Sequence, residues 1–171
     1  MAGLLLLQVC IIKKSHEISD LYGIIESMEA ITNKRAYYDY HILETHEAGI
    51  ELRGFEVKSV RKGNVSLRGA FATIKGSELW LTNGHIGAYQ SGNTPTDYDP
   101  TRPRRLLMHK KEIGHLIGKL KEKGLTLMPL KMYNKHGKIK VEVGVARGKK
   151  QYDKREVIKK RDTVREKQRG E

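Results

Sequence analysis

Apolar and polar residues alternate with a period of two along much of the chain, which is the pattern of half-buried β-strands. The alternation is clearest at residues 138–145, where every second residue is Ile or Val and the residues between are Lys, Glu or Gly. Residues 125–133 predict the preceding strand, and the polar residues 134–137 predict the turn between them. Residues 70–74 and 78–82 predict another hairpin, joined by a turn that contains Gly76.

The segment 37–57 also suggests a hairpin, although its alternation is weaker. Tyr-rich residues 37–44 predict one strand, residues 47–49 a turn, and residues 50–57 a second strand. Residues 57–61 then suggest a short helical turn that Gly63 stops.

One stretch has a clear helical period. Between residues 109 and 123, Ile113, Leu116, Ile117 and Leu120 form an apolar stripe, and the lysines lie mostly on the other face. Gly124 is expected to end this helix.

About six short strands and one inserted helix define the expected fold. Because small antiparallel sheets tend to hide their edges, we expect a mainly β protein that closes into an oligonucleotide-binding (OB-like) barrel. An open α+β sandwich fits the same periodicity and stays an alternative. Residues 89–103 hold three of the four prolines and predict a long loop, and Arg102, Arg104 and Arg105 follow at its end.

Composition indicates a polyanionic partner. The chain of 171 residues has a formal net charge of +13 and a pI near 9.8, which favours nucleic acid first and an anionic membrane surface second. A single cysteine excludes a disulfide framework and a cysteine-based zinc site. No H-x-x-x-H pair or Ser/His/Asp grouping is present, so we expect no catalytic site, no metal and no cofactor. No stretch approaches the ~20 apolar residues of a membrane helix, and a cytoplasmic protein is expected.

Charge also divides the chain into three parts. Residues 1–32 have a net charge of −2, the body 33–146 contains 20 Lys and Arg against 11 Asp and Glu, and the tail 147–171 contains 11 against 5. The tail has too few apolar residues to order alone, but its interspersed acids favour a helix once a polyanion neutralises it. A solvated tail that only aids solubility is the alternative reading.

Glu47 is the unusual residue of the basic body. A carboxylate near RNA is repelled by phosphates, so it is useful there only if it accepts hydrogen bonds from base N–H groups. A solvated acidic residue in a turn is equally compatible with composition alone.

Six blocks then resemble one bacterial family, the SsrA-binding proteins or small protein B, in order and spacing. The blocks are Asn33-Lys34-Arg35-Ala36, Glu47-Ala48-Gly49-Ile50-Glu51-Leu52, Gly54-Phe55-Glu56-Val57-Lys58-Ser59, Asn83-Gly84-His85-Ile86, Asp99-Pro100-Thr101-Arg102-Pro103-Arg104-Arg105-Leu106-Leu107 and Gly144-Val145-Ala146-Arg147-Gly148-Lys149-Lys150-Gln151-Tyr152-Asp153-Lys154-Arg155.

The resemblance implies an OB-like barrel that binds transfer-messenger RNA and enables trans-translation, the rescue of stalled ribosomes. The tail would occupy the empty decoding centre and mRNA channel of the small subunit, and elongation factor Tu would be met only indirectly, through the charged RNA. A monomer without enzymatic activity or membrane association is implied.

The resemblance also assigns residues. The body residues expected to contact the tRNA-like domain are Asn33, Lys34, Glu47 and Leu107, with Lys58, Arg102 and Arg105 added from their charge. The tail residues expected to contact ribosomal RNA are Gly148, Lys149, Lys150, Tyr152, Lys154 and Arg155, with Tyr152 as a stacking ring.

Residues 1–32 have no counterpart in the family, whose members usually begin shortly before the Asn-Lys pair. We therefore hypothesise that Met28 is the physiological start. Three alternatives to ribosome rescue stay open at this point: a ribosomal or general RNA-chaperone barrel, an RNA-processing enzyme, and a membrane-surface protein.

Overall fold

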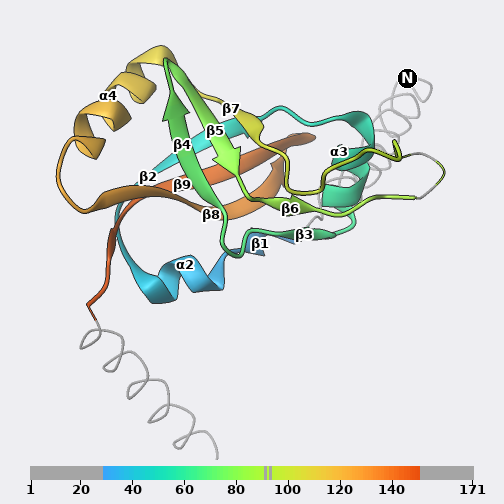
Figure 1. Ribbon diagram of the computed structural model, residues 1–171, viewed down its shortest axis with the longest axis horizontal. Helices are drawn as coiled ribbons and strands as arrows, with labels where there is room; N and C mark the ends of the chain where they lie inside the picture. Colours follow the sequence, from blue (N-terminus) through green and yellow to red (C-terminus); the bar gives the residue numbers. More distant parts are fainter. Residues whose placement is uncertain (1–28, 91, 93, 151–171) are drawn as a thin grey trace, which may run out of the picture.

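Six antiparallel strands pair side by side until the last meets the first. Their order around the ring is β2 (Tyr40–Ile50), β9 (Lys138–Gly148), β8 (Leu125–Lys135), β4 (Phe71–Lys75), β5 (Glu78–Thr82) and β7 (Arg104–Leu107). β7 pairs with β2 through Gly49↔Leu107 and Ile50↔Leu106, which closes the ring (Figure 1). The computed structural model describes residues 29–90, 92 and 94–150. A mainly β architecture of about six antiparallel strands is therefore confirmed.

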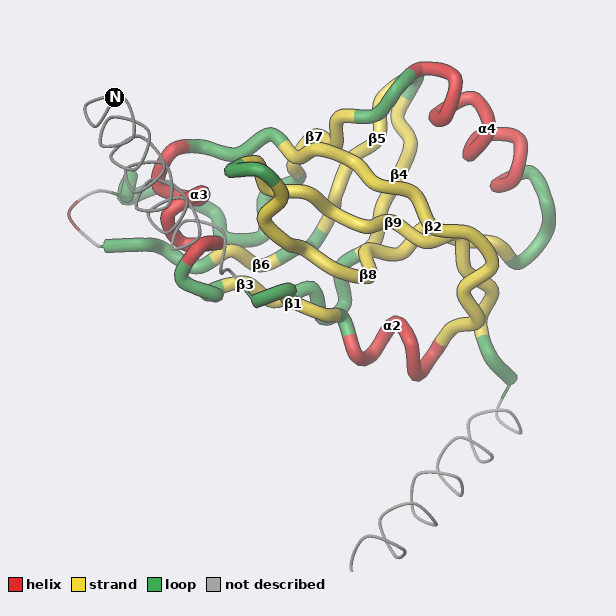
Figure 2. Tube along the Cα trace, turned by 180° about the vertical axis from the view of Figure 1, so that it is seen from behind, coloured by secondary structure: helices red, strands yellow, loops and turns green. Residues whose placement is uncertain are grey.

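Within the residues that the structure describes, three helices and three short strands surround the ring. They are α2 (Lys34–Asp39), α3 (Gly54–Arg61), α4 (Lys110–Leu120), β1 (Ile31–Thr32), β3 (Val65–Ser66) and β6 (His85–Ile86). β1 extends the sheet beside β8, and β3 pairs with β6. Two opposite views show α3 and α4 at different ends of the ring, with α2 beside the end of β9 (Figures 1 and 2).

Two hairpins and the long helix lie where the sequence predicts them. β4 pairs with β5 from Phe71↔Thr82 to Lys75↔Glu78. β8 pairs with β9 as far as Lys135↔Lys138, and the turn residues His136 and Gly137 have φ values of 51° and 75°. Two successive positive φ values are typical of the type I′ turn that suits the twist of a hairpin.

The predicted hairpin within residues 37–57 is wrong. Lys34–Asp39 is helical because the Asn33 side chain accepts a hydrogen bond from the amide of Ala36 and caps the first turn. Residues 47–49 are not a turn but part of β2, which continues to Ile50. The second expected strand is replaced by α3, where the Glu56 side chain accepts a hydrogen bond from the Arg53 amide at 2.7 Å. Local helix capping therefore outweighs the β propensity of these residues.

The core fills the ring. Alternate residues of the strands supply buried side chains, and α3 and α4 each contribute one, Val60 and Leu116, both fully buried. A smaller cluster lies under α2, formed by Ala36, Met128, Leu130 and Ala146.

A register shift in β8 between Pro129 and Lys131 allows this strand to contribute side chains to both hydrophobic clusters. Leu127 and Met132, on either side of the shift, face the main core, whereas Leu130 faces α2. Gly144 is paired with Met128 and packs beside Leu130, where an added Cβ would lie 2.8 Å from the Leu130 side chain. This close approach explains why β9 has a glycine at this position.

Within the described part of the chain, no helix combines the length and the hydropathy needed to cross a bilayer.

Candidate nucleic-acid interface

Glu47 lies on the outer face of β2, where the β8–β9 hairpin supplies it with donors. The Tyr133 hydroxyl donates to its carboxylate at 2.6 Å and the Lys135 ammonium at 2.9 Å. The ammonium of Lys140 lies 3.6 Å away. The side chain of Glu47 is 35% exposed, so the carboxylate is held in place and is still accessible to a ligand.

These contacts fix the charge of the group. The hydrogen bonds from Tyr133 and Lys135 lower the pKa of Glu47 to about 2. Burial and the hydrogen bond to Glu47 raise the pKa of Tyr133 to about 12. Glu47 is therefore an ionised acceptor, and Tyr133 a neutral donor, throughout the physiological range.

Leu107 lies beside Glu47 although sixty positions separate them in the sequence. In β7, Arg104 and Leu106 point into the core while Arg105 and Leu107 point out, and Leu107 is 50% exposed. An added Cβ at Gly49 would lie 3.3 Å from the Leu107 side chain, so only a small residue fits there. A shallow hollow is lined by Glu47, Gly49, Leu107, Met108, His109, Glu112 and Lys140.

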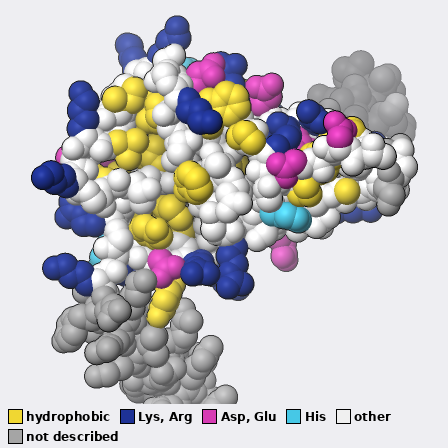
Figure 3. All heavy atoms as spheres, viewed as in Figure 1, with side chains coloured by type: hydrophobic (Ala, Val, Ile, Leu, Met, Phe, Trp, Pro, Cys, Tyr) yellow, Lys and Arg dark blue, Asp and Glu magenta, His cyan; other side chains and the backbone are white. Residues whose placement is uncertain are grey.

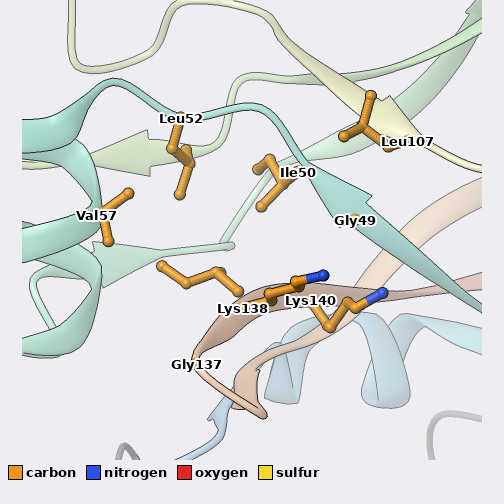
Figure 4. A pocket seen from close by; sticks show the side chains of 9 residues that line it. Gly49, Ile50, Leu52, Val57, Leu107, Gly137, Lys138 and Lys140 are labelled. Carbon is orange, nitrogen blue, oxygen red and sulfur yellow. The ribbon is translucent and has the colours of Figure 1, made fainter.

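A second hollow adjoins the first. Ile50 and Leu52 and, from α3, Val57 face the side chains of Lys138 and Lys140, and Leu107 borders this hollow too (Figure 4). An apolar wall opposite two ammonium groups can contact a base or ribose on one side and a phosphate on the other.

Arg105 lies on the same outward face as Leu107. It is paired across the strands with Trp80, and its guanidinium lies 3.0 Å from the carboxylate of Glu78, with both side chains well exposed. An exposed pair of this kind is weak, so Arg105 can exchange Glu78 for a phosphate.

Asn33 and Lys34 have different places in the structure despite being neighbours. The Asn33 side chain is buried, with 4% exposure. Its Nδ2 donates to the carbonyls of Leu67 and Pro129 at 2.9 and 3.0 Å. Asn33 therefore anchors α2, and its expected contact with RNA stays a prediction. Lys34, the first residue of α2, is exposed.

Lys149 connects the start of the tail to α2. Its ammonium donates to the carbonyl of Tyr37, and its amide to that of Asp39, both at 2.9 Å. A cation at the C-terminal end of a helix satisfies free carbonyls and complements the helix dipole. Gly148 and Lys150 are exposed on either side. The tail residues Tyr152, Lys154 and Arg155 lie outside the described residues.

Lys58 lies on α3, apart from α2 and α4 (Figure 1). The ammonium groups of Lys58 and Lys62 lie 5.8 and 4.6 Å from the ring centre of Tyr89. Figure 3 shows Lys and Arg side chains around the margin of one face, with apolar side chains exposed between them. Basic residues are thus distributed over the body rather than gathered in one cleft.

Arg102 is not the free cation that the basic cluster suggests. Its guanidinium forms two hydrogen bonds with the buried carboxylate of Glu56, through Nε and Nη2. Arg104 donates to the same carboxylate at 2.9 Å and is itself fully buried. The Tyr98 hydroxyl completes the group by donating to Glu56 at 3.1 Å. Arg102 thus neutralises Glu56, and its expected contact with RNA stays a prediction.

Sequence reasoning missed the partners of Glu47. Tyr133, Lys135 and Lys140 come from a hairpin that lies almost ninety positions later in the chain. The outward alternation of Lys138, Lys140 and Glu142 along β9 was a signal, since β9 pairs with β2 at Glu47↔Glu142. The pairing of these two strands, however, is not readable from either strand alone.

An antiparallel β ring whose basic surface includes the ordered carboxylate of Glu47 and the exposed side chain of Leu107 defines a class of protein that suits a polyanion that also presents bases. Comparisons with known proteins agree with this class. A family model described as SmpB protein matches residues 30–171. The chain belongs to the SmpB protein family.

Individual relatives are similar over most of their length. An SsrA-binding protein of Carboxydothermus hydrogenoformans is 59% identical over 134 residues, covering 78% of this chain and 89% of that protein. An SsrA-binding protein of Thermosipho africanus is 58% identical over 135 residues, covering 78% and 90%. A chain in a solved structure, described as "tmRNA-SmpB: a journey to the center of the bacterial ribosome", is 50% identical, with a TM-score of 0.60. The match covers 71% of this chain and 85% of the chain in the solved structure.

Proposed function

We propose that this protein is an RNA-binding adaptor of trans-translation: it binds the tRNA-like domain of transfer-messenger RNA and brings it to a stalled ribosome. Membership of the SmpB family and the similarity to SsrA-binding proteins support this function. The protein acts by binding alone, as a monomer in the cytoplasm, and reaches elongation factor Tu only through the charged RNA.

The ring is best classified as an OB-like barrel. Its six antiparallel strands close through β2–β7 and β8–β9 pairing, and α4 is inserted between β7 and β8. Loops and strand ends at the rim of such barrels hold nucleic acid ligands.

The observation that carries the proposal is the environment of Glu47. An ionised carboxylate, fixed by Tyr133 and Lys135 and flanked by exposed Leu107, is useless for binding phosphate but suited to accept from a base N–H group. The surrounding ammonium groups offset its repulsion of the RNA backbone. The site therefore combines a base-reading group with an electrostatic one.

Different residues of the body have different roles in this proposal. Glu47 and Leu107 contact bases or riboses, and Lys34 and Arg105 contact phosphates. Lys58, on another part of the surface, adds to the general attraction for RNA. Asn33 and Arg102 act indirectly, by fixing α2 and the loop that ends at Arg104.

The tail, residues 147–171, acts on the ribosome. Gly148, Lys149 and Lys150 leave the body beside α2, and Lys149 sets the direction of exit. Beyond them, Tyr152, Lys154 and Arg155 contact small-subunit RNA in the empty decoding centre and mRNA channel. The tail thereby replaces the missing codon–anticodon duplex.

The base-reading role is tested with Glu47→Gln, which keeps an acceptor for Tyr133 but removes the charge. One lost base contact is worth about 1–3 kcal/mol, or roughly 5- to 150-fold in affinity for the tRNA-like domain. Binding of random RNA should not weaken, because phosphates gain nothing from Glu47. Glu51→Gln, at an exposed glutamate just after β2, is the control. Equal losses for specific and random RNA contradict base reading.

The tail is tested by truncation before Gly148. Affinity for the isolated tRNA-like domain should remain near that of the full chain, whereas tagging on stalled ribosomes should be abolished. A collapse of affinity for the isolated RNA contradicts the division between a binding body and a ribosome-sensing tail.

A further inference from the structure

Three potential metal ligands meet between β2 and α4. Glu44 and His46 lie on the face of β2 opposite Glu47, because side chains alternate along a strand. His115 comes from α4 and lies across from them. The carboxylate oxygen of Glu44 and one ring nitrogen of each histidine all lie within 4.8 Å of one another.

The three side chains converge on a single point. The Oε2 atom of Glu44 lies 2.9 Å from His115 Nε2 and 3.6 Å from His46 Nε2. The two imidazole rings are 5.9 Å apart and inclined by 54°. The rings are therefore tilted against each other rather than stacked.

His46 lacks a hydrogen bond where one is expected. Its Nε2 atom is buried and, among the described residues, has no hydrogen-bond partner. A buried polar atom left in this state is costly and calls for an explanation. An ion bound by the lone pair of Nε2 would satisfy it.

The spacing suits a tetrahedral metal. Zinc binds imidazole nitrogen and carboxylate oxygen at about 2.0–2.2 Å, which places neighbouring ligand atoms roughly 3.3 Å apart. The two carboxylate–imidazole separations bracket that value, and the two imidazole nitrogens lie within 4.8 Å of each other, so side-chain rotations can bring the three atoms to the required distance. Two histidines and one carboxylate are also the ligand set of zinc sites that keep an open fourth position.

We propose that Glu44, His46 and His115 form a binding site for a divalent transition metal of the zinc type. Water occupies the fourth position, since the three side chains are 33%, 20% and 50% exposed. Lys119 binds the other oxygen of Glu44 at 2.8 Å and orients the carboxylate. The bound ion links β2 to α4 and stabilises the closed ring. The spacing of these residues in the sequence matches no recognised metal motif, and only the packing of α4 on β2 brings them together.

The experiment uses the full chain with Cys10→Ser in every variant, so that its thiol does not bind the probe. Zn²⁺ affinity is measured by calorimetry, and Co²⁺ is added as a spectroscopic probe. The site predicts one ion per chain, the intense visible absorption of tetrahedral Co²⁺, and a higher midpoint of thermal unfolding with Zn²⁺ present.

His46→Gln and His115→Gln each remove one ligand. Each should weaken Zn²⁺ binding by more than the roughly 10- to 100-fold lost when an outer-shell partner is removed. His41→Gln, at an exposed histidine of β2 beyond the register shift that separates Ile42 from Glu44, is the matched control and should bind as the parent does. Circular dichroism verifies that each variant is folded.

Three results overturn the proposal. The parent protein binds no Zn²⁺ up to millimolar concentration, or its Co²⁺ complex has only the weak absorption of an octahedral ion, or His41→Gln weakens binding as much as His46→Gln. None of these results bears on RNA binding, which is measured separately.

Discussion

The guanidinium of Arg104 and the carboxylate of Glu56 are joined by a hydrogen bond of 2.9 Å and are both closed to solvent. They come from β7 and α3, which are separated by almost fifty positions. The remaining donors of Arg104 reach the carbonyls of Gly84, Arg102 and Pro100 and the hydroxyl of Tyr98. A fully satisfied buried ion pair of this kind fixes one arrangement of the chain around it, and here that arrangement includes residues 98–102 of the long loop.

Glu56→Gln should therefore be strongly destabilising. The amide leaves the buried Arg104 without a countercharge, and breaking a buried pair in this way costs about 3–5 kcal/mol. Urea unfolding of the variant and the parent measures the loss of unfolding free energy. Glu78→Gln, which breaks the exposed pair with Arg105, is the control and should lose less than ~1 kcal/mol. Similar losses for both variants contradict the role assigned to the buried pair.

The same pair predicts how stability depends on pH. Burial acts to raise the pKa of Glu56, but the hydrogen bonds from Arg102 and the Arg53 amide and the charge of Arg104 hold it below the ordinary 4.5. A lowered pKa gives stability that is present above the unfolded value and is lost as pH falls through the folded value. The difference in unfolding free energy between the parent and Glu56→Gln should stay constant well above pH 4.5 and shrink below it. A difference that does not change in acid contradicts the shift.

The features of the fold that the sequence predicted correctly are those that depend on a single stretch of the chain. The β4–β5 and β8–β9 hairpins and α4 each depend on one continuous stretch, so periodicity and turn residues suffice. The segment 37–57 failed because its Tyr and Ile residues have β propensity, whereas the Asn33 cap and the Glu56 side chain select helices on either side of β2.

The candidate site was also predictable from the sequence only where its residues depend on local sequence or on family resemblance. Glu47 and Leu107 were expected from family resemblance, and their placement in one hollow requires the Gly49↔Leu107 strand pair. Arg102 was assigned to RNA because three arginines in four residues look like a basic patch. Only the fold shows that two of them neutralise Glu56, which lies about fifty positions earlier in the chain.

Tyr133→Phe should raise the pKa of Glu47. The hydrogen bond from the Tyr133 hydroxyl is the largest single contribution that lowers that pKa to about 2, and Lys135 lowers it through both its hydrogen bond and its charge. Loss of the hydroxyl should move the pKa towards the ordinary carboxyl value, and so should Lys135→Met. Titration of the Glu47 carboxyl carbon by NMR measures both shifts. No change in Tyr133→Phe contradicts the direct hydrogen bond.

Lys149→Met tests whether the anchored start of the tail matters on the ribosome. The Lys149 amide keeps its bond to Asp39, and only the ammonium bond to Tyr37 is lost, so stability should fall by no more than about 0.3–1 kcal/mol. Tagging on stalled ribosomes should fall more than affinity for the isolated tRNA-like domain. Lys123→Met, at an exposed lysine after α4, is the control for loss of one charge. Equal effects of the two variants on tagging would mean that charge, rather than position, is what Lys149 contributes.

Asn33→Ala should lower the stability of the protein, and it should weaken RNA binding only through that loss of stability. The variant loses the cap on Ala36 and the hydrogen bonds that Asn33 donates to the carbonyls of Leu67, which keeps the Ala70 amide as a donor, and of Pro129, for a combined loss of roughly 2–4 kcal/mol. Asn33→Asp keeps an acceptor for the cap but cannot donate to the two carbonyls, so it should be destabilising as well. Both variants should regain much of their affinity for the tRNA-like domain at low temperature, where they are folded. Persistent loss of affinity in fully folded Asn33→Ala, judged by circular dichroism, would instead make Asn33 a direct contact to RNA and contradict its role in anchoring α2.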